Sequence, residues 1–360
     1  SEYAAGVMRR EWTWLHDALE RGSLQAPIDV AALTAAADEI VSSADVEEAK
    51  SRIRQLRNRQ LVHILWRSIS NSDDVWQTLE ALSTLSDVLI AASVRIAVQS
   101  LRPRFGLPIN TEGEPVPLVI LAMGKLGGNE LNFSSDIDLI FLYTEEGETN
   151  GPRAVSAHEY FTKLSHQIVG LLDDVTADGF AYRVDTRLRP FGDSGPPVVS
   201  FAALENYLLQ HGRSWERYAY VKARVISPDA NDADIDDLIR NVIDPFVYRR
   251  YLDYGVFESL REMKALIATE VRKRELQSNI KLGPGGIREI EFIAQSLQLV
   301  RGGADQKLRC RELRTALTRL GRSRGLEPAA VAALLEAYSF LRRLENGIQA
   351  IRDQQTHDLP

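Results

Sequence analysis

The stretch Gly124–Tyr143, GKLGGNELNFSSDIDLIFLY, places a glycine-rich segment before two aspartates that stand one residue apart at the head of an apolar run. In an extended strand successive side chains point to opposite faces, so Asp136 and Asp138 project from the same face. Two carboxylates held this close stay ionised when a cation lies between them, and hard oxygen ligands favour Mg²⁺. The stretch therefore predicts a metal site at the start of a buried strand.

The glycine-rich segment itself is typical of a phosphate-binding loop. Glycines let the backbone approach a phosphate closely and turn N–H groups toward it, and a lysine adds a point charge. Single Gly-Gly or Asp-x-Asp dipeptides are more often a plain turn or strand entry, so the prediction depends on their combination. The Walker A spacing is not present. We predict phosphate or nucleotide contacts from Lys125, Gly127, Gly128, Ser134 and Ser135.

A third acid comes from the stretch Phe180–Pro190, FAYRVDTRLRP, which alternates as a second strand does. Asp185 shares a face there with arginines, which by itself is also compatible with a structural ion-pair ladder. A glycine- and proline-rich loop follows directly at residues 191–196, and such loops are typical of the rim of a site. We predict Asp185 as the third ligand of a two-metal site, and Arg187 and Arg189 as phosphate contacts.

Four blocks of sequence carry a family resemblance: residues 124–141, YRVDTRLRPFGDSGP at 182–196, WERYAYVKARV at 215–225 and KLGPGGIREIEF at 281–292. In this order they resemble the bifunctional glutamine synthetase adenylyltransferase/adenylyl-removing enzymes, within the DNA polymerase β-like nucleotidyltransferase superfamily. The resemblance implies an α+β fold, with a small mixed sheet and largely helical flanking regions. By position, it makes Gly127 and Gly128 the glycine pair, and Asp136, Asp138 and Asp185 the catalytic metal ligands.

The resemblance also implies a reaction. The family enzyme has two modules, one attaching AMP to a tyrosine of glutamine synthetase and the other removing it by phosphorolysis with release of ADP. One such module occurs here, and its sequence resembles the amino-terminal half, which removes AMP. We therefore expect an excised removing half. The resemblance implies two Mg²⁺ ions, with Mn²⁺ as the alternative. The implied partners are adenylylated glutamine synthetase, a PII signalling protein, phosphate, ADP and ATP.

Two alternatives stay open at this point. The same acids serve the attaching reaction, in which ATP is consumed and pyrophosphate is released. A member of a different class would be a catalytically silent regulatory module that docks glutamine synthetase or a PII protein.

Composition limits the remaining classes. The chain has 360 residues, a net charge of −7 and a pI near 5.5, which argues against non-specific nucleic-acid binding. Cys310 is the only cysteine, so neither an intrachain disulfide nor a Cys/His zinc cluster is expected. We find no unbroken run of about 18 apolar residues, and we expect a cytoplasmic protein that binds no membrane.

Spacing along the chain predicts three regions. Residues 1–104 form a helical lead-in region, residues 105–228 the catalytic core, and residues 229–360 a helical domain. In the core we expect strands over 118–123, 136–143 and around 182–187, with a helix over 156–172. The third region contains an apolar stripe from Leu260 to Val271, a basic triplet at 272–274, and a helix over 287–300 behind the glycine turn 283–286.

Overall fold

The computed structural model describes residues 1–42, 45–227, 230–249 and 279–358, together with residues 258, 261, 262, 264, 265 and 269. The predicted apolar stripe, whose members are Leu260, Met263, Leu266, Ile267 and Val271, lies outside the described residues, as does the basic triplet.

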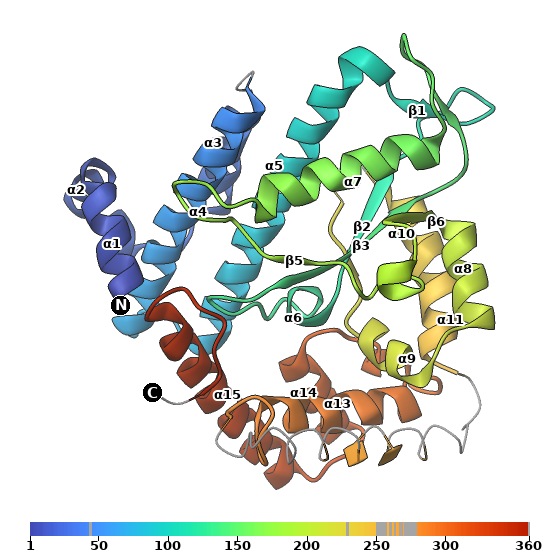
Figure 1. The fold of residues 1–360 in the computed structure, drawn as a ribbon. Helices are drawn as coiled ribbons and strands as arrows, with labels where there is room; N and C mark the ends of the chain where they lie inside the picture. Colours follow the sequence, from blue (N-terminus) through green and yellow to red (C-terminus); the bar gives the residue numbers. More distant parts are fainter. Residues whose placement is uncertain are drawn as a thin grey trace.

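A small mixed sheet lies at the centre of the fold (Figure 1). Strand β3 (Ile137–Tyr143) pairs antiparallel with β2 (Leu118–Ala122), and β2 pairs antiparallel with β7 (Arg224–Val225). On its other side β3 pairs in parallel with β5 (Val184–Asp185) and β6 (Val198–Ser200). The expected succession of strand, strand, helix and strand is β2, β3, α7 (Ala157–Asp173) and β5, so the predicted α+β class is confirmed.

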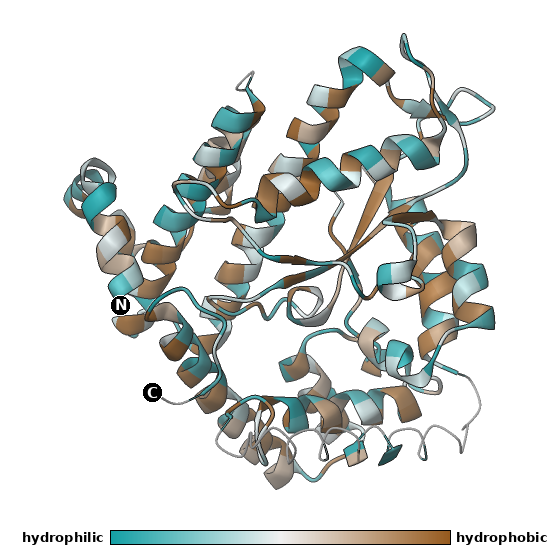
Figure 2. Cartoon of the chain, viewed as in Figure 1, coloured by the Kyte–Doolittle hydropathy of each residue, from teal (hydrophilic) through white to brown (hydrophobic). Residues whose placement is uncertain are grey.

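Both faces of this sheet are buried. Ile120 of β2 belongs to an apolar cluster shared with α4, α5 and α7, whereas its neighbour Leu121 belongs to a second cluster shared with α8 and α9. The strands β2 and β3 are accordingly almost wholly apolar, as the brown strands of Figure 2 show. Polar side chains on these strands therefore stand out, and Asp138 is the one acid within them.

The amino-terminal part is a layer of helices. Its members are α1 (Glu2–Arg10), α2 (Trp12–Glu20), η1 (Ser23–Gln25), α3 (Val30–Val41), α4 (Val46–Ile69) and α5 (Val75–Phe105). By length and composition α5 is apolar enough to cross a membrane. However, 61% of its most apolar window is buried in the protein, against α3, α4 and α7. Thus α5 is the central helix of this layer.

Helices also flank the sheet on its other sides. The short strands β1 (Pro108–Ile109) and β4 (Glu148–Thr149) form a separate two-stranded ladder. Along the chain, η2 (Gly192–Ser194), α8 (Phe201–Gln210) and α9 (Ser214–Tyr220) follow β5. After them come α10 (Asp232–Asp237), η3 (Leu238–Ile243), α11 (Asp244–Val247), α13 (Ile287–Arg301), η5 (Gln306–Leu308), α14 (Leu313–Arg322) and α15 (Pro328–Ala350). The region boundaries at 104/105 and 228/229 stay predictions.

Candidate active site

The structure brings the three predicted acids together. In the parallel pairing of β3 with β5, Asp138 lies directly opposite Asp185. Asp136 is the residue immediately before β3, so the strand begins one residue later than predicted. The amide N–H of Ile137 donates to the carbonyl of Arg183 at 2.9 Å, which fixes the two strands at this point. Three carboxylates therefore gather where the two strands begin to pair.

Asp138 is the most perturbed of the three. Burial raises its pKa to about 6, and the negative charges of Asp185 and Asp136 add to the effect. Its carboxylate makes no hydrogen bond or ion pair with any other residue that the structure describes. A half-buried carboxylate without a partner, next to two further acids, is a donor set that suits a divalent cation, so these residues fit a metal site.

Two arginines hold the other two acids. Arg183 donates from Nε to Oδ1 of Asp136 at 2.6 Å, and its guanidinium lies over the Phe180 ring at 5.0 Å. Arg187 donates from Nε to both oxygens of Asp185, at 3.1 and 3.0 Å. The hydrogen bond from Arg187 lowers the pKa of Asp185, and the carboxylate is ionised at neutral pH. Asp185 thus carries its negative charge directly opposite Asp138.

Arg189 lies differently from the prediction. It was expected to share a strand face with Arg187, but β5 has only two residues because the backbone N–H of Arg187 donates to Oδ1 of Asp185 at 2.8 Å and starts a turn. The guanidinium of Arg189 then donates to the carbonyl and hydroxyl oxygens of Thr186, at 2.9 and 2.7 Å. In this geometry Arg189 closes its own loop, and its phosphate contact stays a prediction.

The glycine-rich segment forms a short helix, α6 (Gly124–Gly127), instead of an open loop. The N–H groups of Gly127 and Gly128 donate to the carbonyls of Met123 and Gly124, so they do not face a ligand. A Cβ on Gly127 would collide with the carbonyl oxygen of Lys222, and the glycine there serves close packing. The phosphate contacts of Gly127 and Gly128 stay predictions, and in this geometry they would require the two N–H groups to leave their partners in α6.

Gly124 is the glycine that touches the acids. Its φ of +55° lies in the left-handed region, and a Cβ there would stand 2.5 Å from Oδ2 of Asp138. From the sequence, Gly124 was grouped with Gly127 and Gly128 as a glycine that lets the backbone approach a phosphate, and its contact with Asp138 was not predicted. The available signal was its position two residues after the end of the buried strand β2, where the chain turns into α6 with positive φ.

Lys125 and the two serines are mostly directed into the protein. The Lys125 ammonium is 2.8 Å from Oε1 of Glu345, an acid that is fully buried in α15. Ser134 is also buried, and its N–H donates to Gln349 of α15 at 3.0 Å. Ser135 is half-buried. The predicted phosphate contact of Lys125 therefore requires the ammonium to leave Glu345.

Helix α15 supports the segment in front of the acids through a buried polar network. The N–H of Phe133 donates to Asn346 at 3.0 Å, and the fully buried Arg342 stands 3.2 Å from Glu345. The network continues to buried acids and a lysine of the core. Its further members are Glu130, Lys222 and Glu291, with Lys222 Nζ 3.0 Å from each of the two acids. Sequence reasoning missed this support because its members are distant in sequence.

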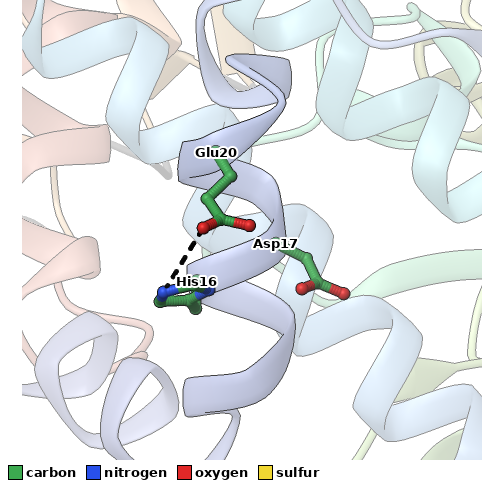
Figure 3. A group of neighbouring side chains, drawn as sticks. All are labelled: His16, Asp17 and Glu20. Carbon is green, nitrogen blue, oxygen red and sulfur yellow. Dashed lines mark ion pairs between the residues drawn. The ribbon is translucent and has the colours of Figure 1, made fainter.

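A second group of possible ligands, His16, Asp17 and Glu20, lies on α2 (Figure 3). All three are exposed, and His16 Nε2 lies 3.7 Å from Glu20 in the ordinary i,i+4 arrangement of a solvated helix. Asp17 points to another side of the helix in Figure 3. We assign no metal to this group.

Comparison with known proteins decides the family. The profile described as glutamate-ammonia ligase adenylyltransferase matches residues 1–237, which contain all three acids. The chain belongs to this adenylyltransferase family. A second profile, described as GlnD PII-uridylyltransferase, matches residues 261–360.

Curated relatives of the adenylyltransferase family align along most of the chain. A bifunctional glutamine synthetase adenylyltransferase/adenylyl-removing enzyme of Shewanella frigidimarina is 52% identical over 87% of this chain and 33% of its own length. Relatives with the same name from Chromobacterium violaceum and Thioalkalivibrio sulfidiphilus are 50% and 44% identical, over 86% and 100% of this chain and 34% and 37% of their own lengths. The chain thus spans about a third of these relatives, and it belongs to a family of nucleotidyltransferase enzymes.

Proposed function

We propose that this chain removes AMP from an adenylylated tyrosine of glutamine synthetase by phosphorolysis. The observation that carries nucleotidyl transfer is the pairing of Asp138 with Asp185 across two parallel strands, with Asp136 just before β3. The names of the relatives, which cover both attaching and removing activities, support this class of reaction. The choice of removal rests on the segment NELNFSSDIDLIF, residues 129–141, which resembles the removing half.

In this reaction an oxygen of inorganic phosphate attacks the phosphorus of the bound AMP. The bond to the tyrosine oxygen breaks, the tyrosine takes up a proton, and ADP leaves. Asp136, Asp138 and Asp185 would hold two Mg²⁺ ions, or Mn²⁺, which would stabilise charge on the transferring phosphoryl group and on the leaving oxygen. The chain itself holds the three carboxylates in register through β3 and β5, and no covalent protein nucleophile is required.

The test is an assay for labelled ADP. The purified chain is incubated with adenylylated glutamine synthetase, Mg²⁺ and labelled phosphate, and Asp138→Ala is compared with Asp193→Ala, an acid on the neighbouring loop whose side chain is 77% exposed. Labelled ADP that disappears only in Asp138→Ala supports phosphorolytic removal. AMP transfer from ATP to unmodified glutamine synthetase would favour the attaching reaction, and neither product would favour a docking module.

A further variant separates chemistry from folding. Asp136→Asn should lower turnover at least about 100-fold, because the amide is a poorer metal ligand than the carboxylate. Its Tm should stay close to that of the unchanged protein, since Asp136 lies at a strand end and is only half-buried. A large fall in Tm in the absence of metal would contradict this separation.

The second profile supports a proposal about regulation. Because residues 261–360 match a PII-uridylyltransferase profile, we propose that a PII protein modulates the activity. Repeating the ADP assay with PII in its unmodified and uridylylated forms tests this, and an unchanged rate in both would oppose it. We further propose a cytoplasmic location, where glutamine synthetase would be met.

A further inference from the structure

The two arginines at the acids are held in very different ways. Arg183 has other contacts besides Asp136: it stacks on Phe180 and reaches the carbonyl and hydroxyl oxygens of Ser134 at 3.4 Å. Its side chain is 32% exposed. Removing the guanidinium from Asp136 would break these contacts as well, so Arg183 is a fixed support for this acid.

Arg187, by contrast, is held by Asp185 alone. Its side chain is 71% exposed, and within the described part of the chain its guanidinium hydrogen-bonds only to this carboxylate. The Asp185 side chain is 18% exposed, and an ion pair with one exposed partner contributes on the order of 1 kcal/mol. The guanidinium can therefore leave Asp185 without breaking any other contact.

The position of Arg187 makes this movement consequential. Its bidentate contact covers both oxygens of Asp185, the acid that lies opposite Asp138. A cation bound between Asp138 and Asp185 needs at least one of these oxygens. A guanidinium released at this place would stand at the rim of the site, and its planar pair of N–H donors suits a phosphate group.

We propose that Arg187 exchanges ligands during binding: it covers Asp185 in the free protein, gives way to the metal ion, and then holds the incoming phosphate. This inference rests on the proposed function, and it makes the binding of the metal ion precede that of phosphate. Arg187 is then both a competitor of the metal and a phosphate-binding residue.

Metal binding to the protein alone tests the first half of this exchange. Mn²⁺ is titrated by calorimetry into the unchanged chain, Arg187→Gln, Arg187→Lys and Arg240→Gln. Arg240 is a matched control, because it is 73% exposed and pairs with Asp236 at 3.0 Å elsewhere in the chain. Arg187→Gln should bind Mn²⁺ about three- to fivefold more tightly, which corresponds to loss of one exposed ion pair. Arg240→Gln should bind as the unchanged chain does.

Arg187→Lys separates the contact from the charge. Lysine keeps the positive charge but cannot cover both carboxylate oxygens in the same way. If competition acts through the bidentate contact, this variant also tightens Mn²⁺ binding. If it binds Mn²⁺ as the unchanged chain does while Arg187→Gln binds more tightly, only the general field of the charge matters and the exchange is refuted.

The ADP assay tests the second half. Arg187→Gln should raise the KM for phosphate at least about tenfold with a smaller change in kcat, whereas a merely structural Arg187 would leave this KM unchanged. Unchanged Mn²⁺ affinity or an unchanged KM in Arg187→Gln would overturn the exchange while leaving the function intact. Failure of the function has a different signature, namely Mn²⁺ binding or ADP release that does not depend on Asp138.

Discussion

Replacing Gly124 by alanine tests whether this glycine shapes the metal site. The new side chain would meet two obstacles: φ is +55°, and the Cβ would stand 2.5 Å from Oδ2 of Asp138. The left-handed backbone costs a non-glycine residue about 1–2 kcal/mol. The collision involves the end of a side chain, and Asp138 can relieve it by turning its carboxylate away. The main damage should therefore fall on metal binding.

Gly113 supplies the matched control. Its φ is +84°, but a Cβ there would have nothing within 4 Å. Urea unfolding should show that Gly113→Ala and Gly124→Ala both lose about 1–2 kcal/mol of unfolding free energy. Mn²⁺ titration should show an affinity about tenfold lower in Gly124→Ala alone, equivalent to about 1.4 kcal/mol. Unchanged Mn²⁺ affinity in Gly124→Ala would refute the assignment of Gly124 to the site.

Three further predictions concern the support of the core. Lys222→Met leaves Glu130 and Glu291 without their shared cation and should lower the unfolding free energy, measured in urea, by about 3–5 kcal/mol. The control Lys163→Met removes an exposed lysine and should lower it by less than about 1 kcal/mol. Similar losses in the two variants would contradict this prediction. Burial opposes ionisation of Glu291, but the Lys222 ammonium prevails and lowers its pKa to about 2. The ionised Glu291 thus stabilises the folded protein fully above its unfolded pKa near 4.5, and this stabilisation is lost as the pH falls toward 2. The difference in unfolding free energy between the unchanged protein and Glu291→Gln should therefore shrink below about pH 5. A difference that grows at low pH would contradict the pairing of Glu291 with Lys222. The fully buried Arg54 donates to the carbonyls of Gly179 and Leu171. Arg54→Met should therefore lower the unfolding free energy by about 2–4 kcal/mol and speed hydrogen exchange across residues 171–179. Unchanged exchange in this segment would contradict the prediction.

The acids could be located from the sequence because their signal is local. The alternation around Asp136 and Asp138 fixes which face they occupy, and the apolar run after them fixes the buried strand. The alternation over residues 180–190 and the glycine- and proline-rich loop after it predict Asp185 as the third acid, but local spacing does not show which strand it pairs with. The structure adds the register, in which Asp138 and Asp185 are direct partners.

The surroundings of the residues predicted to bind phosphate were harder to predict, because they depend on side-chain contacts that regular spacing does not show. The sequence around Lys125 predicts an ammonium group without a partner beside the glycines. Its partner Glu345 is 220 residues further along the chain. Arg189 belongs to a stretch whose alternation predicts a strand. However, the Arg187 N–H donates to Asp185 and the Arg189 guanidinium donates to Thr186, and β5 ends after two residues. Glu345 leaves no trace in the sequence near Lys125, whereas Thr186 lies only three residues before Arg189, and what local spacing does not show is that its side chain takes up the guanidinium.

The hold of α15 on the catalytic segment limits how the chain can be divided. A gene fragment that ended near residue 237, where the adenylyltransferase profile stops, would still encode all three acids. It would lack Glu345, Asn346 and Gln349, which hold Lys125 and the backbone of residues 133–134. The regions matched by the two profiles therefore pack against each other through these buried polar contacts. A substitution on this face of α15 must be compatible with the segment that precedes Asp136. A cut between the two profiles would therefore separate the three acids from the helix that supports the segment in front of them.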